Sequence, residues 1–156
     1  AYCGKTTLPR LAEHPNLVVM RTLSKVGLAG LRVGYTIASR AIAQLLEKVR
    51  PPYNLSSLDQ RAAAFVLREA RDWCDAQAAE VVSERTRLAA ALARHGEVFP
   101  SQANLVLVRF ANARATWQKL VDAGVLVRLF DAGALAGCLR ITVGTPAEND
   151  LLLRSL

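Results

Sequence analysis

Apolar positions recur along the chain at two spacings, and these predict strands and helices in alternation. Runs of β-branched and large apolar residues at 17–21 and 32–38 predict two strands joined by a loop. Over 40–49, apolar side chains recur every three or four residues, which predicts a helix that Pro51-Pro52 must end. The first third of the chain therefore has two strands, a helix and a proline break.

Polar caps and glycines divide the remainder into shorter elements. The pattern predicts helices over 57–69 and 72–94, a strand over 104–110, a helix over 115–123, strands over 125–128 and 138–143, and a closing helix from Pro146. Strands and helices in this order predict a mixed α/β chain, with a hinge near the prolines and an α/β sandwich built on a small sheet after it.

Composition narrows the kinds of partner. The net charge is +7 over 156 residues, but between 40 and 94 the basic residues are interleaved with acidic ones, as on solvated helix faces, so we expect no nucleic-acid partner. No apolar run approaches the roughly 20 residues of a membrane span, and we expect no membrane association. The three cysteines have no metal-ligand spacing, which predicts no metal site, free thiols and a cytoplasmic location.

The segment over 21–35, Arg-Thr-Leu-Ser-Lys-Val-Gly-Leu-Ala-Gly-Leu-Arg-Val-Gly-Tyr, concentrates the groups that can carry chemistry. The amine of Lys25 can form an imine with an aldehyde, while Thr22, Ser24 and Arg32 offer two hydroxyls and a fixed cation for a phosphate. A pyridoxal cofactor needs both functions side by side. The alternative is an ordinary loop lysine with Arg32 in a surface ion pair.

A second segment over 137–145, Gly-Cys-Leu-Arg-Ile-Thr-Val-Gly-Thr, places Arg140 within an apolar strand. A guanidinium within an apolar strand predicts a bound anion, because its planar group of N–H donors can bind a carboxylate bidentately. That anion is either the carboxylate of an amino-acid-like substrate or a structural carboxylate of the protein.

The segment over 21–35 closely resembles the cofactor-lysine motif of histidinol-phosphate aminotransferases, within the fold type I pyridoxal-phosphate enzymes. The resemblance implies that Lys25 bonds to the cofactor and later moves a proton between the substrate α-carbon and the cofactor. It also implies that Thr22, Ser24 and Arg32 bind the cofactor phosphate. Many members of the family place three residues between this lysine and Leu-Ala-Gly, whereas Val26-Gly27 are two, so the loop after Lys25 is one residue shorter here.

The resemblance extends to both ends of the chain. Ala1-Tyr2 match the end of an Asp-Glu-Ala-Tyr motif, which implies that Tyr2 binds the cofactor and that the aspartate paired with the ring lies before residue 1. We therefore expect an incomplete segment, inactive alone. Arg140 would bind the substrate carboxylate. Arg128 would lie near a substrate phosphate or be a surface arginine, and Asn104 would close over the substrate or start a strand.

Taken together, the resemblance implies an α/β fold, in which the end of the large-domain sheet of a fold type I pyridoxal-phosphate enzyme is followed by the small C-terminal α/β sandwich domain. The ranges are 1–50 for the large-domain part, 51–56 for the hinge and 57–156 for the small domain.

The function that the resemblance implies is transamination of L-histidinol phosphate with 2-oxoglutarate in histidine biosynthesis, by a homodimer that uses pyridoxal 5′-phosphate. The substrates would be small molecules, the first of them amino-acid-like and phosphorylated. The alternatives are a lyase similar to threonine-phosphate decarboxylase and a non-catalytic small-domain fragment for binding or dimerisation.

Overall fold

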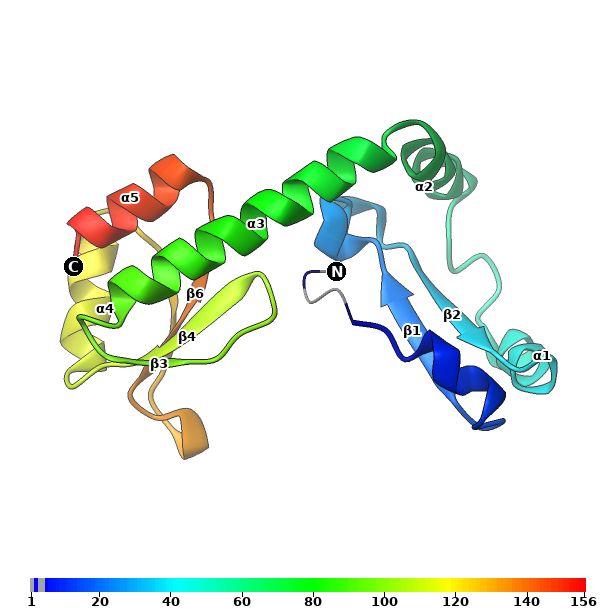
Figure 1. Cartoon of the computed structure of the whole chain (residues 1–156), viewed down its shortest axis with the longest axis horizontal. Helices are drawn as coiled ribbons and strands as arrows, with labels where there is room; N and C mark the ends of the chain where they lie inside the picture. Colours follow the sequence, from blue (N-terminus) through cyan, green and yellow to red (C-terminus); the bar gives the residue numbers. More distant parts are fainter. Residues whose placement is uncertain (1, 3–4) are drawn as a thin grey trace. The chain divides into compact units, whose positions relative to one another are not determined.

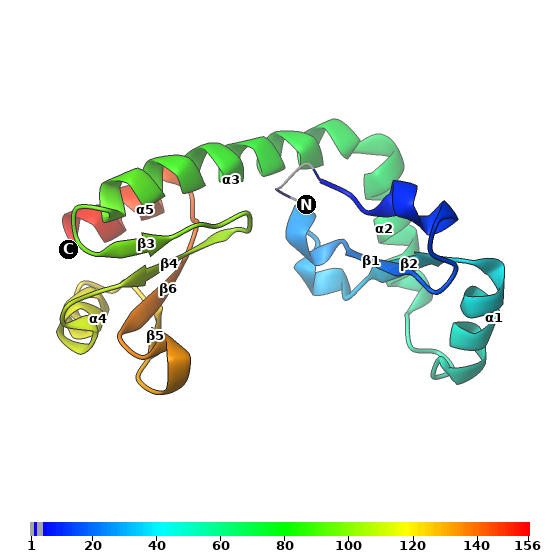
Figure 2. The ribbon, with the colours of Figure 1, turned by 60° about the horizontal axis from the view of Figure 1, so that its bottom comes forward.

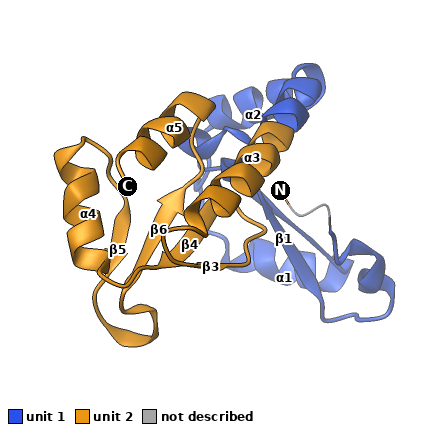
Figure 3. Ribbon diagram, turned by 60° about the vertical axis from the view of Figure 1, so that its left-hand side comes forward, with its two compact units in different colours: residues 1, 3–77 blue, residues 2, 78–156 orange. Residues whose placement is uncertain are grey.

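The chain forms two compact units in the computed structural model, which describes residue 2 and residues 5–156. The first unit ends at Gln77, and the second comprises Ala78–Leu156 together with Tyr2 (Figure 3). Helix α3 (Arg71–Leu92) begins in the first unit and continues into the second. None of the helices among the described residues is long and apolar enough to cross a membrane.

The first unit is built on a two-stranded antiparallel sheet (Figure 1). Its elements are the 3-10 helix η1 (Leu8–Ala12), strand β1 (Val18–Thr22), the 3-10 turns η2 (Ser24–Val26) and η3 (Ala29–Leu31), strand β2 (Gly34–Ala38), and helices α1 (Arg40–Val49) and α2 (Ser57–Glu69). In the ladder Val18 lies opposite Ala38 and Thr22 opposite Gly34, so the loop over 23–33 closes the hairpin.

Local chemistry explains most of these boundaries. Helix α1 covers the predicted range and ends where Arg50 turns extended, because a residue before proline avoids the helical region. Helix α2 starts after Ser56, whose hydroxyl accepts the Asp59 N–H at 3.0 Å. Strand β2 begins two residues later than the predicted strand over 32–38, because Arg32 has a left-handed backbone with φ 54° and cannot enter the ladder.

The second unit is a four-stranded antiparallel sheet with the order β3-β4-β6-β5 (Figure 2). Its elements after α3 are β3 (Glu97–Phe99), β4 (Leu105–Arg109), α4 (Ala113–Asp122), β5 (Arg128–Phe130), the 3-10 turn η4 (Gly133–Leu135), β6 (Cys138–Thr142) and α5 (Pro146–Arg154). Helix α5 starts with a capping box between Thr145 and Glu148, at the predicted helix start.

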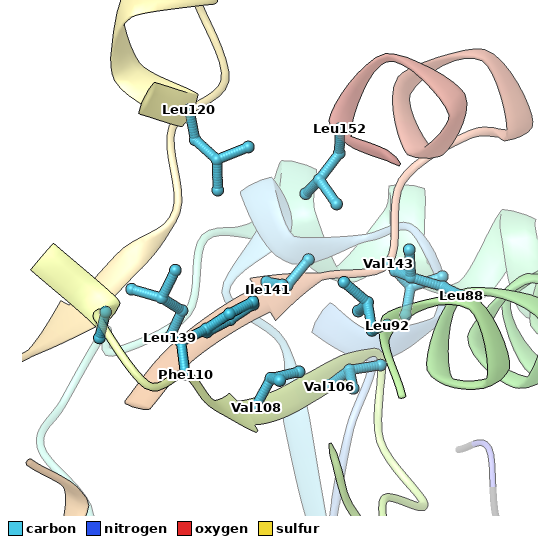
Figure 4. Packing of buried hydrophobic residues seen from close by; sticks show 11 residues of the cluster. Leu88, Leu92, Val106, Val108, Phe110, Leu120, Leu139, Ile141, Val143 and Leu152 are labelled. Atoms are coloured by element: carbon cyan, nitrogen blue, oxygen red, sulfur yellow. The ribbon is translucent and has the colours of Figure 1, made fainter. Parts of the chain in front are cut away.

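One face of this sheet carries the core. Alternate residues of β4 and β6 are buried against leucines of helices α3, α4 and α5, as Figure 4 shows. The side chains with no exposed surface include Leu88, Leu92, Val106, Val108, Leu120, Leu139 and Ile141. The period of two along the strands leaves Leu107 and Arg140 on the opposite face.

Two predictions for this unit need correction. The strand predicted over 125–128 is instead β5, three residues further on, because Gly124 ends helix α4 with φ 79° and the Val125 N–H bonds back to the Leu120 carbonyl at 2.8 Å. The short strand β3 was not predicted, since three residues give too little pattern to distinguish a strand from a loop. The mixed α/β class itself is confirmed.

Candidate active site

Lys25 lies on a loop that is tied to one buried residue. It belongs to η2, immediately after β1, and follows Leu23, which is only 5% exposed. The Leu23 N–H donates to the Val33 carbonyl at 3.0 Å, while the Leu23 carbonyl accepts from Val26 at 3.1 Å and Leu28 at 3.2 Å. These bonds close the loop on both sides of the lysine and fix where its side chain starts.

The two hydroxyl residues before the lysine are joined by a local turn. The Ser24 N–H donates to the Thr22 Oγ1 at 3.1 Å, so these two residues are held next to each other at the end of β1. Opposite Thr22 the ladder has Gly34, where a Cβ would lie 3.0 Å from the Arg21 carbonyl oxygen. A side chain at position 34 would therefore push the strands apart beside the loop that carries Lys25.

Lys25 and Thr22 line one cavity of the first unit, with a volume of about 690 Å³. Among the described residues that line it, four are basic and one, Asp75, is acidic. The basic residues are Lys5, Arg21, Lys25 and Arg71. Asp75 pairs with Arg71 at 3.4 Å. An excess of cations next to threonine hydroxyls suits a phosphate group, and the lysine amine suits an aldehyde. The cavity therefore fits a ligand that carries both groups.

Ser24 and Arg32 are not among the residues that line this cavity. Arg32 is exposed, and its guanidinium donates to the Ala29 carbonyl at 3.3 Å within its own turn. Ser24 is half-buried beside Thr22. The structure thus brings Thr22 and Lys25 together in the cavity and places Ser24 and Arg32 elsewhere on the same loop.

In the second unit, Arg128 and Arg140 lie directly opposite each other across β5 and β6. Both are exposed on the sheet face that the core does not use. Like charges opposite each other in a sheet destabilise it unless an anion lies between or beside them. The Arg128 guanidinium lies 5.8 Å from the ring centre of Phe130, which holds it over an aromatic face.

Within the described part of the chain, neither arginine forms an ion pair or a side-chain hydrogen bond. This contrasts with Arg109, on the neighbouring strand, which pairs with Glu97 at 3.2 Å. A structural carboxylate as the partner of Arg140, one of the two alternatives from the sequence, is therefore not what the structure shows. The arginine pair instead forms a cationic site that suits a carboxylate or a phosphate.

The two remaining predicted residues have less defined surroundings. Asn104 lies just before β4, where its carbonyl accepts the Val143 N–H at 3.0 Å and continues the ladder by one residue. Tyr2 is half-buried, and burial raises the pKa of its phenol above the usual 10.0.

Several cavity residues were missed from the sequence. Arg21 donates to the Thr6 hydroxyl at 2.8 Å, and Arg71 reaches the same cavity from helix α3. Arg21 is the first residue of the segment over 21–35, so its position in this segment was a usable signal. No local pattern ties Arg71 to Lys25, because the fold alone brings α3 against the loop. No group of metal-binding side chains is present among the described residues.

Comparison with known proteins gives consistent matches. The family model described as aminotransferase class I and II matches residues 2–156. A histidinol-phosphate aminotransferase from Methylibium petroleiphilum is 46% identical over 159 residues, covering 99% of this chain and 43% of the relative. The solved histidinol-phosphate aminotransferase from Sinorhizobium meliloti, in complex with pyridoxal-5′-phosphate, matches with a TM-score of 0.78 and 32% identity, covering 90% of this chain and 40% of that one.

A solved L-threonine-O-3-phosphate decarboxylase from Porphyromonas gingivalis also matches, with a TM-score of 0.71 and 25% identity, covering 94% of this chain and 47% of that one. The chain therefore spans less than half the length of each of these proteins. The matches confirm the resemblance found in the sequence, the fold class and, at the level of the family, pyridoxal phosphate as the cofactor.

Proposed function

We propose, from the premise that this chain belongs to the aminotransferase class I and II family, that it supplies the cofactor lysine and a substrate-binding arginine pair to a pyridoxal-phosphate aminotransferase. The observation that carries the proposal is the position of Lys25. It is held on a closed loop and lines a cationic cavity together with the Thr22 hydroxyl.

The residues of the cavity suit the cofactor. When bound, pyridoxal phosphate supplies an aldehyde that takes up the substrate's amino group and a ring that withdraws electrons. Lys25 would hold the cofactor through its amine, and Thr22 would donate to the phosphate. Ser24 and Arg32, on the same loop, are proposed as further phosphate ligands, and Tyr2 as a ligand of the ring.

The same residues would act during turnover. Lys25 Nζ is the group that we assign to take the proton from the substrate α-carbon, because a positioned amine is a suitable general base. Arg140 would fix a carboxylate of 2-oxoglutarate bidentately, and Arg128 would bind a second anionic group, such as the phosphate of the amino donor. Asn104 is proposed to close over the bound substrate.

The specific reaction is transamination of L-histidinol phosphate with 2-oxoglutarate, in histidine biosynthesis, by a cytoplasmic homodimer. The name of the 46% identical relative supports the amino donor, and the opposed arginines suit anionic groups such as the phosphate of this donor and the carboxylates of 2-oxoglutarate. In this proposal residues 1–50 are the end of the large domain, 51–56 the hinge and 57–156 the small domain.

Covalent trapping tests the cofactor lysine. We would incubate the chain with pyridoxal phosphate, reduce it with borohydride and locate the pyridoxyl group by peptide mass spectrometry. We expect Lys25 to be labelled ahead of Lys48, an exposed lysine on α1 that serves as the internal control. Equal labelling of both lysines would contradict the proposal.

The decarboxylase is the second candidate, since the Porphyromonas enzyme shares the fold. The two reactions differ in their products. In the full-length protein, we expect glutamate to form from 2-oxoglutarate and L-histidinol phosphate, and no carbon dioxide to be released from L-threonine O-3-phosphate. Replacing Arg140 by Lys should raise KM for 2-oxoglutarate, whose carboxylate it would bind, whereas Arg114→Lys, at an exposed ion pair with Asp131, should not.

A further inference from the structure

The indole of Trp73 lies against the backbone of the loop that carries Lys25. Gly27, two residues after the lysine, has φ +88°, and a Cβ built on it would lie 3.2 Å from Cη2 and 3.3 Å from Cζ3 of Trp73. The ring thus fills the space in which a side chain at position 27 would stand. Both the backbone conformation and the contact require glycine there.

This contact lies at the residue after Lys25 that has the most backbone freedom. Two residues separate Lys25 from Leu28, and the second of them is Gly27, the residue type with the greatest backbone freedom. The amides of Val26 and Leu28, on either side of Gly27, donate to the carbonyl of the buried Leu23. Gly27 itself lies against the Trp73 ring.

We propose that Trp73 is a positioning residue for Lys25: its ring restrains Gly27 and thereby the direction in which the lysine leaves the loop. This inference rests on the proposed function. Helix α3 is itself anchored beside the lysine, because Cys74, the residue after Trp73, is buried and lines the same cavity as Lys25.

Exposure separates this role from ordinary packing. Trp73 is 52% exposed and does not belong to the core cluster, so its removal leaves no enclosed cavity. By contrast Trp117 packs on the core and its Nε1–H donates to the Val127 carbonyl at 3.1 Å. The contact of Trp73 with the loop therefore fixes a backbone position more than it stabilises the unit.

The test compares rates of reductive pyridoxylation at Lys25 in variants of the whole chain. We expect Trp73→Ala to slow labelling of Lys25 about tenfold, because a displaced reacting group loses orientation, and to leave the labelling of Lys48 unchanged. Trp73→Phe keeps an aromatic ring at this position and should restore the rate to within about twofold. An unchanged Lys25 rate in Trp73→Ala would overturn the inference.

A pair of glycine variants provides the matched control. Gly27→Ala should slow Lys25 labelling at least as much as Trp73→Ala, whereas Gly30→Ala should not, because a Cβ at Gly30 would meet no atom within 4 Å. Equal effects of the two glycine changes would contradict a specific contact with Trp73.

Hydrogen exchange separates this inference from the proposed function. In Trp73→Ala, we expect the amides of Val26 and Leu28 to exchange faster, while those of β6 keep their protection. If Lys25 of the parent chain is labelled no faster than Lys48, the proposed function fails, and exchange at Val26 and Leu28 still decides whether Trp73 holds the loop. Unchanged exchange at both amides would then refute the role of Trp73.

Discussion

In the second unit, the apolar faces of three helices and one sheet pack together in a single core. In the first unit, by contrast, the apolar face of helix α1 is exposed. Leu88, Leu139 and Ile141 have no exposed surface, but Leu45 and Val49 of α1 are 59% and 77% exposed. The buried apolar residues of the first unit are few among those described: Val19, Leu23, Ala63 and Cys74.

The two units differ in whether their own residues cover the apolar stripes of their helices. A helix with one apolar stripe is stable only when another surface covers the stripe. The second unit supplies these surfaces from its own residues, since β4 and β6 lie next to each other and present the same face to α3, α4 and α5. In the first unit the candidate cofactor lysine thus lies in a region with little core of its own, held by local hydrogen bonds and by Trp73.

The largest expected effect is on the core of the second unit. Leu92→Ala should lower the free energy of unfolding by about 2–5 kcal/mol, because it leaves a cavity among fully buried side chains. The matched change Leu45→Ala in the first unit should alter it by less than about 0.5 kcal/mol, since that side chain is mostly exposed. Urea unfolding followed by tryptophan emission measures both; similar losses would show that α1 is packed.

Two glutamates with the same local geometry provide the second comparison. Glu84 and Glu47 each accept two hydrogen bonds from an arginine three residues later, Arg87 and Arg50. Glu84 is buried and also accepts from the Asn149 amide at 2.8 Å, whereas Glu47 is exposed. We expect Glu84→Gln to lower the urea midpoint at neutral pH clearly, and Glu47→Gln to change it little, because water screens exposed pairs.

The pH dependence of these variants has a defined sign. The hydrogen bonds from Arg87 and Asn149 hold the pKa of Glu84 below its ordinary value of 4.5. The folded-state pKa is lowered, so the contribution of this carboxylate to stability is present above pH 4.5 and is lost as the pH falls through the folded-state value. The urea midpoint of the parent should therefore fall on acidification below about pH 5, and that fall should be shallower in Glu84→Gln.

Helix caps give a smaller effect. Thr145 caps α5 in the second unit, where its hydroxyl accepts the Glu148 N–H at 3.4 Å, and Ser56 caps α2 in the first. Thr145→Ala should cost the second unit about 1 kcal/mol, measured by urea unfolding. Ser56→Ala should increase hydrogen exchange at the start of α2 and leave the second unit's unfolding unchanged. A loss in the second unit from Ser56→Ala would mean that the two units unfold together.

The smallest effect on stability is expected at the exposed face of α1. Val49→Gln should change the free energy of unfolding by less than about 0.5 kcal/mol and reduce light scattering at high concentration, because it removes part of an apolar patch. The control is Leu126→Gln, at a residue of the second unit that is 82% exposed. If light scattering falls equally with both changes, the exposed face of α1 is not the main surface for self-association.

Strong local signals allowed much of the fold to be predicted. The helix over 40–49 was correct at both ends, because a regular apolar spacing and a proline pair define it. The Thr145 cap was identifiable from a polar residue before an apolar run, whereas for α2 the sequence left Ser56 and Ser57 as alternatives and the structure has Ser56 as the cap. Arg32 and Val125 were misplaced, since a left-handed residue and a helix-closing hydrogen bond interrupt β-rich runs that look continuous in the sequence.

The sequence by itself determined the chemistry: the lysine with two hydroxyls before it, the arginines of two strands and the family these motifs resemble. Only the tertiary structure decided which of these groups meet. The antiparallel register places Arg128 opposite Arg140, and the packing of α3 on the loop brings Trp73 to Gly27. Such pairings join residues distant in sequence, and their geometry depends on strand register and helix packing, which no local pattern of residues encodes.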